Sequence, residues 1–250
     1  EPYDAPNGDL CFNFNTVFFK TTPDGRLVSA EPQTPLLSMA VQKIRRSRMP
    51  HGRIVLAADG LEALRYAGGL FAHFLEQSGV AVCGRIRPGR VDPDRDRLLF
   101  RHRSPFPMAT VVEGLMAHSN NFTANQILIA AGARRYGPPG TLEKGTRAVS
   151  SFAEEKLGIR HLHMVEGSGI SRENRITAEG LLAVLDRFRP YRRLLAAEHR
   201  VRAKTGTLTG IQTRAGYIES ASGLCRFVIL INTPGRSADR IQRELSAALP

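Results

Sequence analysis

The 250-residue sequence contains no tryptophan and only three cysteines, Cys11, Cys83 and Cys225, which are widely spaced and form no Cys-x-x-Cys pair. This pattern argues against a zinc site, and an odd number leaves at least one thiol free unless it pairs outside these residues. We interpret all three as small buried side chains. No apolar run approaches bilayer length, and no signal peptide is visible, which leaves the compartment open.

Acidic residues are scarce, because 23 Asp and Glu oppose 35 Lys and Arg and give a formal net charge of +12. The densest basic groups, Arg45-Arg46 with Arg48 and Arg192-Arg193, lack the interleaved aromatic residues that stack on bases. The sequence therefore does not favour nucleic-acid binding. We interpret the charge as a solvated face or a simple compositional bias. A basic surface also favours an anionic polymer that bears carboxylates.

With 42% hydrophobic residues, the chain has the composition of an ordinary globular protein and is long enough for one large domain or two small ones. Apolar residues at helical spacing predict helices over 36–46, 61–78, 109–117, 122–135, 141–157, 178–188 (capped by Thr177) and 238–249. Alternating or β-rich runs predict strands over 9–19, 27–30, 80–86 and 201–206, 212–219 and 224–232, with a short extended stretch over 98–101.

The last three predicted strands have links too short for parallel crossovers, so we expect consecutive antiparallel strands of one sheet, with helices on both faces. In the first strand, residues 9–19, the pattern places Leu10, Phe12 and Phe14 on the buried side. Asn13 and Asn15 are accordingly interpreted as outward polar residues of a strand.

The segment Arg202-Ala-Lys-Thr-Gly-Thr-Leu-Thr-Gly210 is the centre of the functional prediction. A lysine and two hydroxyls on a strand edge, with glycines that let another backbone approach, suit an anionic ligand laid along that edge. Lys-Thr-Gly alone is weak evidence, because it recurs by chance.

Upstream, His118-Ser-Asn-Asn121 forms a polar turn between two predicted helices. Ser119 offers a hydroxyl for proton relay, and Asn121 offers a carboxamide that both donates and accepts hydrogen bonds. Ser-x-x-Lys, Ser-Asp-Asn and Lys-Thr-Gly together mark penicillin-binding proteins and class A β-lactamases, and the last two have counterparts here in the right order.

Further segments extend this similarity over nearly the whole chain: Glu166-Gly-Ser-Gly-Ile-Ser171, Pro2-Tyr-Asp-Ala-Pro-Asn-Gly8 and Phe12-Asn-Phe-Asn-Thr-Val17. The sequence resembles the D-alanyl-D-alanine carboxypeptidase/endopeptidase family of low-molecular-weight penicillin-binding proteins, peptidase family S13. The resemblance implies an α+β fold, with an antiparallel sheet flanked by helices as in serine β-lactamases. It also implies that residues 1–55 are the tail of an inserted β-rich accessory domain and that 56–250 belong to the peptidase domain.

The resemblance also implies roles for individual residues in acyl transfer from peptidoglycan stem peptides that end in D-Ala-D-Ala, with β-lactams as inhibitors. Lys204 would hold the terminal carboxylate of the substrate, aided by the hydroxyls of Thr205 and Thr207. Ser119 would shuttle a proton to the leaving amine and Asn121 would hold the acyl-side amide. Thr207 would give one N–H to the oxyanion hole, while Gly206 admits the substrate backbone. No cofactor or metal is implied.

The motif that carries the nucleophile is missing, because none of the serines has a lysine three positions later. The resemblance places that motif upstream of residue 1 and implies a periplasmic or extracytoplasmic location. We therefore expect the chain to be the C-terminal portion of a longer precursor, inactive alone and associated with its missing segment or with itself. The alternative is a degenerate, non-catalytic module that binds cell-wall peptide or a protein partner. The reading frame upstream of residue 1 discriminates between the two.

Other residues that could carry chemistry are given structural interpretations. His118 is interpreted as a helix-end residue, because family members need no histidine. His161 and His163 alternate on an extended stretch, but no carboxylate or cysteine pattern completes a metal site. Glu166 stands where the family usually has aspartate, and the stretch between Phe188 and Arg202 is short, which leaves substrate preference open.

Overall fold

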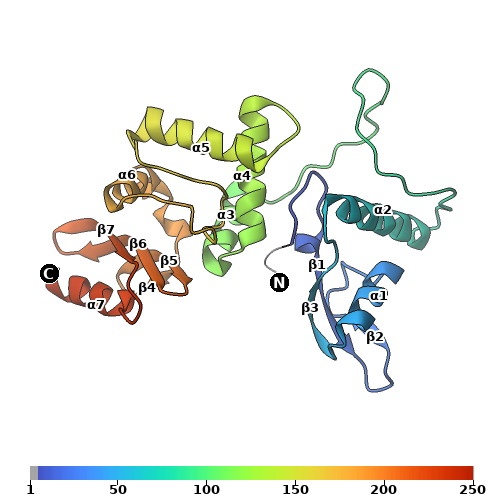
Figure 1. Cartoon of the computed structure of the whole chain (residues 1–250), viewed down its shortest axis with the longest axis horizontal. Coiled ribbons are helices and arrows are strands. Elements are labelled where there is room, and N and C mark those ends of the chain that lie inside the picture. The colour runs from blue at the N-terminus through green and yellow to red at the C-terminus, as the bar shows by residue number, and fades with distance from the viewer. Residues whose placement is uncertain (1–4, 250) are drawn as a thin grey trace. The chain divides into compact units, whose positions relative to one another are not determined.

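The computed structural model of the chain describes residues 5–249 and divides into two compact units, residues 1–103 and 104–250 (Figure 1). The boundary at residue 55, between the tail of an accessory domain and the peptidase domain, stays a prediction. The resemblance noted at residues 2–8 falls partly outside the described residues.

The first unit is built on a three-stranded antiparallel sheet in the order β2-β1-β3. Strand β1 covers Thr16–Thr21, β2 covers Leu27–Ser29 and β3 covers His51–Val55. Helices α1 (Ser38–Ser47) and α2 (Gly60–Gln77) pack on it around a core that includes Val17, Phe19, Ile44, Leu56 and Tyr66. The two predicted helices and the predicted strand over 27–30 are confirmed, whereas β3 was not predicted.

The start of the predicted strand 9–19 is wrong. Asn13, Phe14 and Asn15 form a left-handed 3₁₀ turn with φ of 40°, 59° and 53°, and the strand begins only at Thr16. Asn15 is fully buried, and its Nδ2 donates to the carbonyl of Pro6 at 2.7 Å, whereas Phe14 is 43% exposed. Asparagine tolerates positive φ and bonds to nearby backbone, so the polar residues lie inside here.

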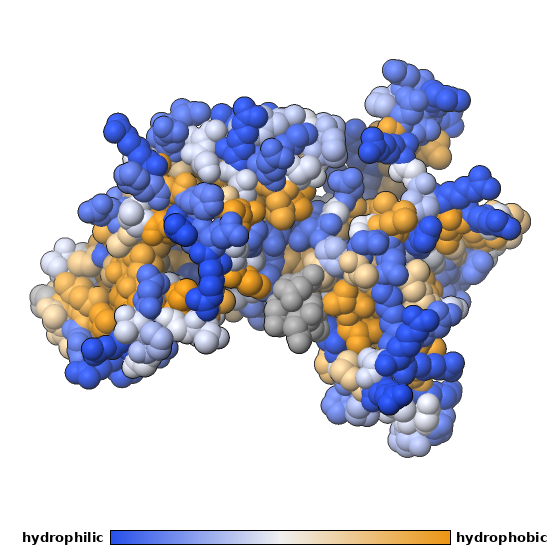
Figure 2. Space-filling model, viewed as in Figure 1, coloured by the Kyte–Doolittle hydropathy of each residue, from blue (hydrophilic) through white to orange (hydrophobic). Residues whose placement is uncertain are grey.

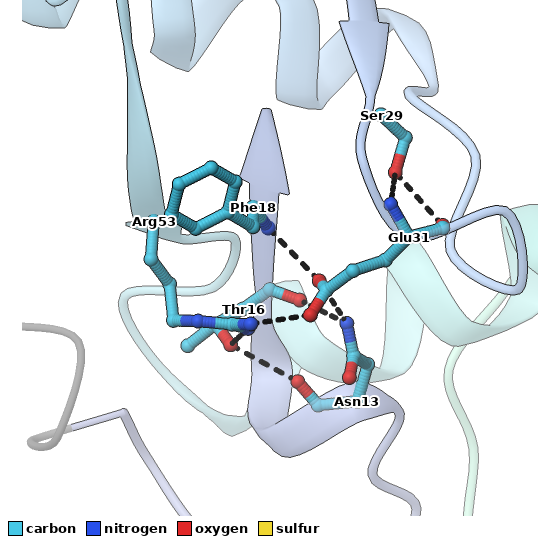
Figure 3. A network of polar contacts seen from close by, with 6 residues as sticks. All are labelled: Asn13, Thr16, Phe18, Ser29, Glu31 and Arg53. Atoms are coloured by element: carbon cyan, nitrogen blue, oxygen red, sulfur yellow. Dashed lines mark hydrogen bonds and ion pairs between the residues drawn. The ribbon is translucent and has the colours of Figure 1, made fainter. Parts of the chain in front are cut away.

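Asn13 also serves the fold through a polar network drawn in Figure 3. Its Nδ2 donates to Oε2 of Glu31 at 2.7 Å, and that oxygen also accepts from the backbone N of Phe18 at 2.9 Å. Arg53 pairs with the same carboxylate and donates to Oγ1 of Thr16 at 2.7 Å. Burial opposes ionisation of Glu31, but the hydrogen bonds from Arg53, Phe18 and Asn13 outweigh it, so its pKa is lowered.

Between α2 and the next helix, which begins at Met108, residues 80–107 contain no helix or strand. The strand predicted over 80–86 is therefore wrong, and the stretch 98–101 is not part of a strand. Large apolar side chains in this segment are exposed, among them Val91, Leu98, Leu99 and Phe100. Cys83 is exposed too, while Cys11 and Cys225 are half-buried, so the expectation of three buried thiols is also wrong.

The second unit begins with the helices α3 (Met108–His118), α4 (Asn121–Tyr136), α5 (Leu142–Leu157) and α6 (Ala178–Phe188). All four were predicted, and Oγ1 of Thr177 caps α6 by accepting from the backbone N of Gly180 at 3.0 Å. A sheet in the order β4-β5-β6-β7 follows. Its strands are Ala197–Glu198, Val201–Leu208, Ile211–Ser220 and Gly223–Ile231, and α7 covers Ala238–Ala248.

Neighbouring strands of this sheet are antiparallel, as predicted, and helices cover both faces. Ile218, Phe227, Ile229 and Ile231 pack with Ala238 at the start of α7 on one face. On the other face Tyr217 packs with Leu185 of α6, and its hydroxyl donates to the carbonyl of Leu185 at 2.6 Å. The alternation of side chains along β6 and β7 produces these two apolar layers.

Candidate active site

Ser119 lies in the turn between α3 and α4, where it ends α3 in a left-handed conformation with φ of 50°. The next residue, Asn120, caps α4, because its Oδ1 accepts from the backbone N of Thr123 at 2.8 Å. Asn121 is the first residue of α4 and is half-buried. The caps of two consecutive helices therefore hold the Ser-Asn-Asn segment, and the exposed Ser119 stands at its tip.

Lys204 on β5 reaches this turn from 85 positions further along the chain. Its Nζ donates to Oγ of Ser119 and to its neighbour's carbonyl, that of Thr205, at 3.0 Å. Partial burial lowers the pKa of Lys204, because the protein solvates the ammonium less well than water does. Among the described residues no carboxylate forms an ion pair with Lys204. The two predicted motifs thus meet at a hydroxyl and an ammonium.

The outer edge of β5 is open beside Lys204. The two-residue strand β4 pairs only with Val201 and Arg202, so in the described part of the chain no strand covers Lys204–Leu208. Thr205 and Thr207 are exposed along this stretch. Such an edge presents unpaired N–H and C=O groups that an extended peptide can join as an added strand.

Packing against β6 requires glycine at position 206, which the sequence did not reveal. Gly206 lies opposite Thr213 on β6, and a Cβ at position 206 would lie 2.4 Å from Oγ1 of Thr213. A side chain here would displace Thr213 and disturb the strand next to Lys204.

A cavity of about 780 Å³ extends from Lys204 and Thr205 beneath the sheet edge. Apolar side chains of α3, α6 and the sheet form most of its wall, among them Met116, Leu181, Leu185, Phe188 and Leu230. Among the described residues that line it, Lys204, Arg172 and Arg175 are charged and none is acidic. An anionic ligand with an apolar body fits this combination.

The Glu166 segment forms another wall of the cavity through Gly169, Ser171 and Arg172. Sequence reasoning found this segment by resemblance alone and missed its partners Asn125 and Asn174. Oδ1 of Asn125 accepts from the backbone N of Gly167 at 2.6 Å, and Oδ1 of Asn174 accepts from the backbone N of Val165 at 2.8 Å. Asn125 lies 42 positions from Gly167 and Asn174 lies nine positions from Val165, and neither belongs to a recognisable sequence pattern, so only the structure reveals them.

No metal centre emerges among residues 5–249, because no group of three or more His, Cys, Asp or Glu side chains is arranged to hold an ion. His163 joins Arg175 through backbone hydrogen bonds alone, with its N–H donating to the carbonyl of Arg175 at 2.9 Å. The helices of these same residues include none long and apolar enough to cross a bilayer.

Comparison with known proteins decides the family. The model of the D-Ala-D-Ala carboxypeptidase 3 (S13) family matches residues 54–189 and 186–249, which is most of the chain. The chain belongs to this peptidase family. The resemblance drawn from the Ser-Asn-Asn and Lys-Thr-Gly segments is therefore confirmed.

Two curated relatives of this chain are D-alanyl-D-alanine carboxypeptidases. The chain is 29% identical over 201 residues to the enzyme of Actinomadura sp. (strain R39), a match that covers 68% of this chain and 37% of the relative. It is 27% identical over 194 residues to DacB of Haemophilus influenzae, which covers 67% of this chain and 40% of the relative. The matches thus span less than half the length of either relative.

Solved structures of penicillin binding protein 4 (dacB) from Haemophilus influenzae share the fold. One, complexed with a β-lactam, has a TM-score of 0.67 at 20% identity and covers 78% of this chain and 53% of its own. A second has a TM-score of 0.65 at 19% identity and covers 92% and 56%. The α+β class with an antiparallel sheet, predicted from the sequence, is confirmed.

Proposed function

We propose that this chain supplies the proton-relay and carboxylate-binding part of the active site of a serine-type D-Ala-D-Ala carboxypeptidase or endopeptidase of peptidoglycan metabolism. The observation that carries the proposal is the hydrogen bond from Nζ of Lys204 to Oγ of Ser119 at an open strand edge. Membership of the S13 family and the names of its relatives give the reaction class.

In this proposal a substrate peptide lies along β5 and places its terminal carboxylate near Lys204, Thr205 and Thr207. The ammonium and the hydroxyls donate to the carboxylate, and such charge-assisted bonds are the strong ones. Ser119, whose hydroxyl Lys204 holds in place, takes up the proton that the attacking serine hydroxyl loses and gives its own proton to the leaving amine. Asn121 holds the amide of the acyl side, Gly206 leaves room for the substrate backbone, and Thr207 gives a backbone N–H to the oxyanion hole.

The nucleophile in this proposal comes from polypeptide outside these 250 residues, because no Ser-x-x-Lys occurs among them. Two features of the second unit support a missing partner. The apolar cavity beside Lys204 is large enough for several side chains. The strand β7 ends the sheet, so within residues 5–249 its outer edge pairs with no other strand, and Figure 2 shows hydrophobic residues at the visible surface around it. An edge of this kind recruits another chain or segment. We place the assembled enzyme outside the cytoplasm, where its peptidoglycan substrate is.

A labelled penicillin tests this function. The chain is incubated with the reagent alone and together with a polypeptide that carries the Ser-x-x-Lys segment of an S13 relative. We expect a stoichiometric adduct on the serine of that segment in the mixture and none on the chain alone. An adduct on the chain alone would overturn the assignment of the nucleophile. If the mixture forms no penicillin adduct but the chain still binds a cell-wall peptide that ends in D-Ala-D-Ala, the result would favour the non-catalytic module instead.

A further inference from the structure

The loop that follows residue 165 is organised around one carboxylate. Oε2 of Glu166 accepts from the backbone N of Ser168 at 2.6 Å and from the hydroxyl of the same residue. Oε1 accepts from the backbone N of Gly169 at 2.9 Å and of Ser171 at 3.2 Å, and also from Nδ2 of Asn174 at 2.5 Å. Five donors therefore converge on a single acidic side chain, and all five come from its own loop.

The same loop is fixed to two other parts of the site. The backbone N of Gly167 donates to Oδ1 of Asn125 at 2.6 Å, which joins the loop to α4. Nη2 of Arg172 donates to the carbonyl of Thr209 at 2.6 Å, and Thr209 lies in the turn between β5 and β6. Glu166 itself does not line the cavity, so it stands behind a wall that the loop presents to Lys204.

We propose that Glu166 is a positioning residue: its carboxylate holds the loop 167–174 in the shape that lets Arg172 anchor the β5–β6 turn and that fixes the cavity wall facing Lys204. The inference rests on the proposed function in one respect only: the ligand that would contact this cavity wall is the proposed D-Ala-D-Ala peptide. The anchoring of the loop and of the turn is a separate claim about the chain itself.

The arrangement requires an ionised carboxylate rather than any polar side chain. Two donors point at one oxygen and three at the other, so a glutamine amide in either orientation would direct its NH₂ group at two or three donors. Burial opposes the charge, but the hydrogen bonds from Ser168, Ser171 and Gly169 outweigh it and lower the pKa of Glu166. The loop therefore holds the charged form at neutral pH.

Amide hydrogen exchange measured by NMR at neutral pH tests the anchoring in the chain as it is. Glu166→Gln should speed exchange at Gly169 and Ser171 by roughly ten- to hundred-fold, because bonds to a charged acceptor are lost. It should also shift the amide resonance of Gly210 in the β5–β6 turn, because this N–H belongs to the same peptide group as the Thr209 carbonyl that Arg172 contacts. Glu166→Asp keeps the charge and should restore most of the protection. The control Glu173→Gln makes the same charge change at an exposed position of the same loop and should match the wild type.

A second measurement tests whether the conformation of the loop 167–174 affects ligand binding beside Lys204. N-acetyl-D-alanyl-D-alanine is titrated into each variant, and we expect roughly ten-fold weaker binding to Glu166→Gln and near wild-type binding to Glu166→Asp. An unchanged Gly210 resonance in Glu166→Gln overturns the proposal, and so does faster exchange at Gly169 and Ser171 with unchanged peptide affinity. A wild-type chain that binds no peptide counts against the proposed function, while the exchange rates and the Gly210 resonance still decide whether Glu166 anchors the loop and the turn.

Discussion

Replacing Lys204 with methionine separates binding from stability at the centre of the site. Methionine has a similar length and no charge, and Lys204 has no carboxylate partner among residues 5–249. Burial lowers the pKa of Lys204, which means that the folded protein holds the ammonium less favourably than the unfolded chain does. We therefore expect Lys204→Met to change the free energy of unfolding by less than about 1 kcal/mol. The expected direction is an increase, because the substitution removes a partly desolvated charge.

The effect on binding should be much larger and specific for one ligand group. A charge-assisted hydrogen bond to a carboxylate contributes about 1.5–3 kcal/mol, which corresponds to a roughly ten- to hundred-fold change in affinity. N-acetyl-D-alanyl-D-alanine should lose this amount in Lys204→Met. Its C-terminal amide lacks the charge and should bind the wild type and the variant equally.

NMR titration that follows the amides of Thr205 and Thr207 measures both affinities, and urea unfolding measures stability. Lys156→Met, at an exposed lysine near the end of α5, serves as the control for a change in overall charge. Equal losses for the acid and the amide would remove Lys204 from the role of carboxylate ligand. A loss of stability well above 1 kcal/mol would show that the contact with Ser119 mainly supports the fold.

Three further predictions concern stability and association. Glu31→Gln should destabilise the first unit by about 1–3 kcal/mol in urea unfolding, because Arg53 loses a partly buried ionic partner, and an unchanged midpoint would contradict the network in Figure 3. The pKa of Glu166 lies below its ordinary value of 4.5, so its contribution to stability is present above that value and is lost as the pH falls through the lowered pKa. Urea midpoints measured against pH should therefore show an acid-side loss in the wild type that is smaller in Glu166→Gln. Size-exclusion chromatography with light scattering should show that the chain alone self-associates through the free edge of β7, and a clean monomer would exclude this.

Much of the second unit follows from the sequence. Its helices repeat apolar residues at helical spacing, and its three long strands are separated by links that permit only antiparallel pairing. These are local patterns, and local patterns are visible without the tertiary structure. The Ser-Asn-Asn and Lys-Thr-Gly segments also stand out locally, which is why the family could be predicted from them.

The first unit shows where such patterns mislead. The alternation around Asn13 and Asn15 predicts a strand, but the side chain of Asn15 bonds to the carbonyl of Pro6 and the chain turns left-handed. The apolar residues over 80–86 predict a strand, yet a strand forms only when another strand pairs with it, and within residues 5–249 none does. Propensity alone therefore did not decide either segment.

The composition of the site was determined by the sequence, whereas its contacts were decided by the tertiary structure. Ser119 and Lys204 were named from their motifs, but their hydrogen bond spans 85 positions and depends on the fold that brings the α3–α4 turn next to β5. Glu166 was noted as a departure from the family, and only the fold shows that its carboxylate gathers five donors within a loop that lines the cavity. A sequence specifies which groups can donate or accept, while the packing of distant segments determines which of those groups meet.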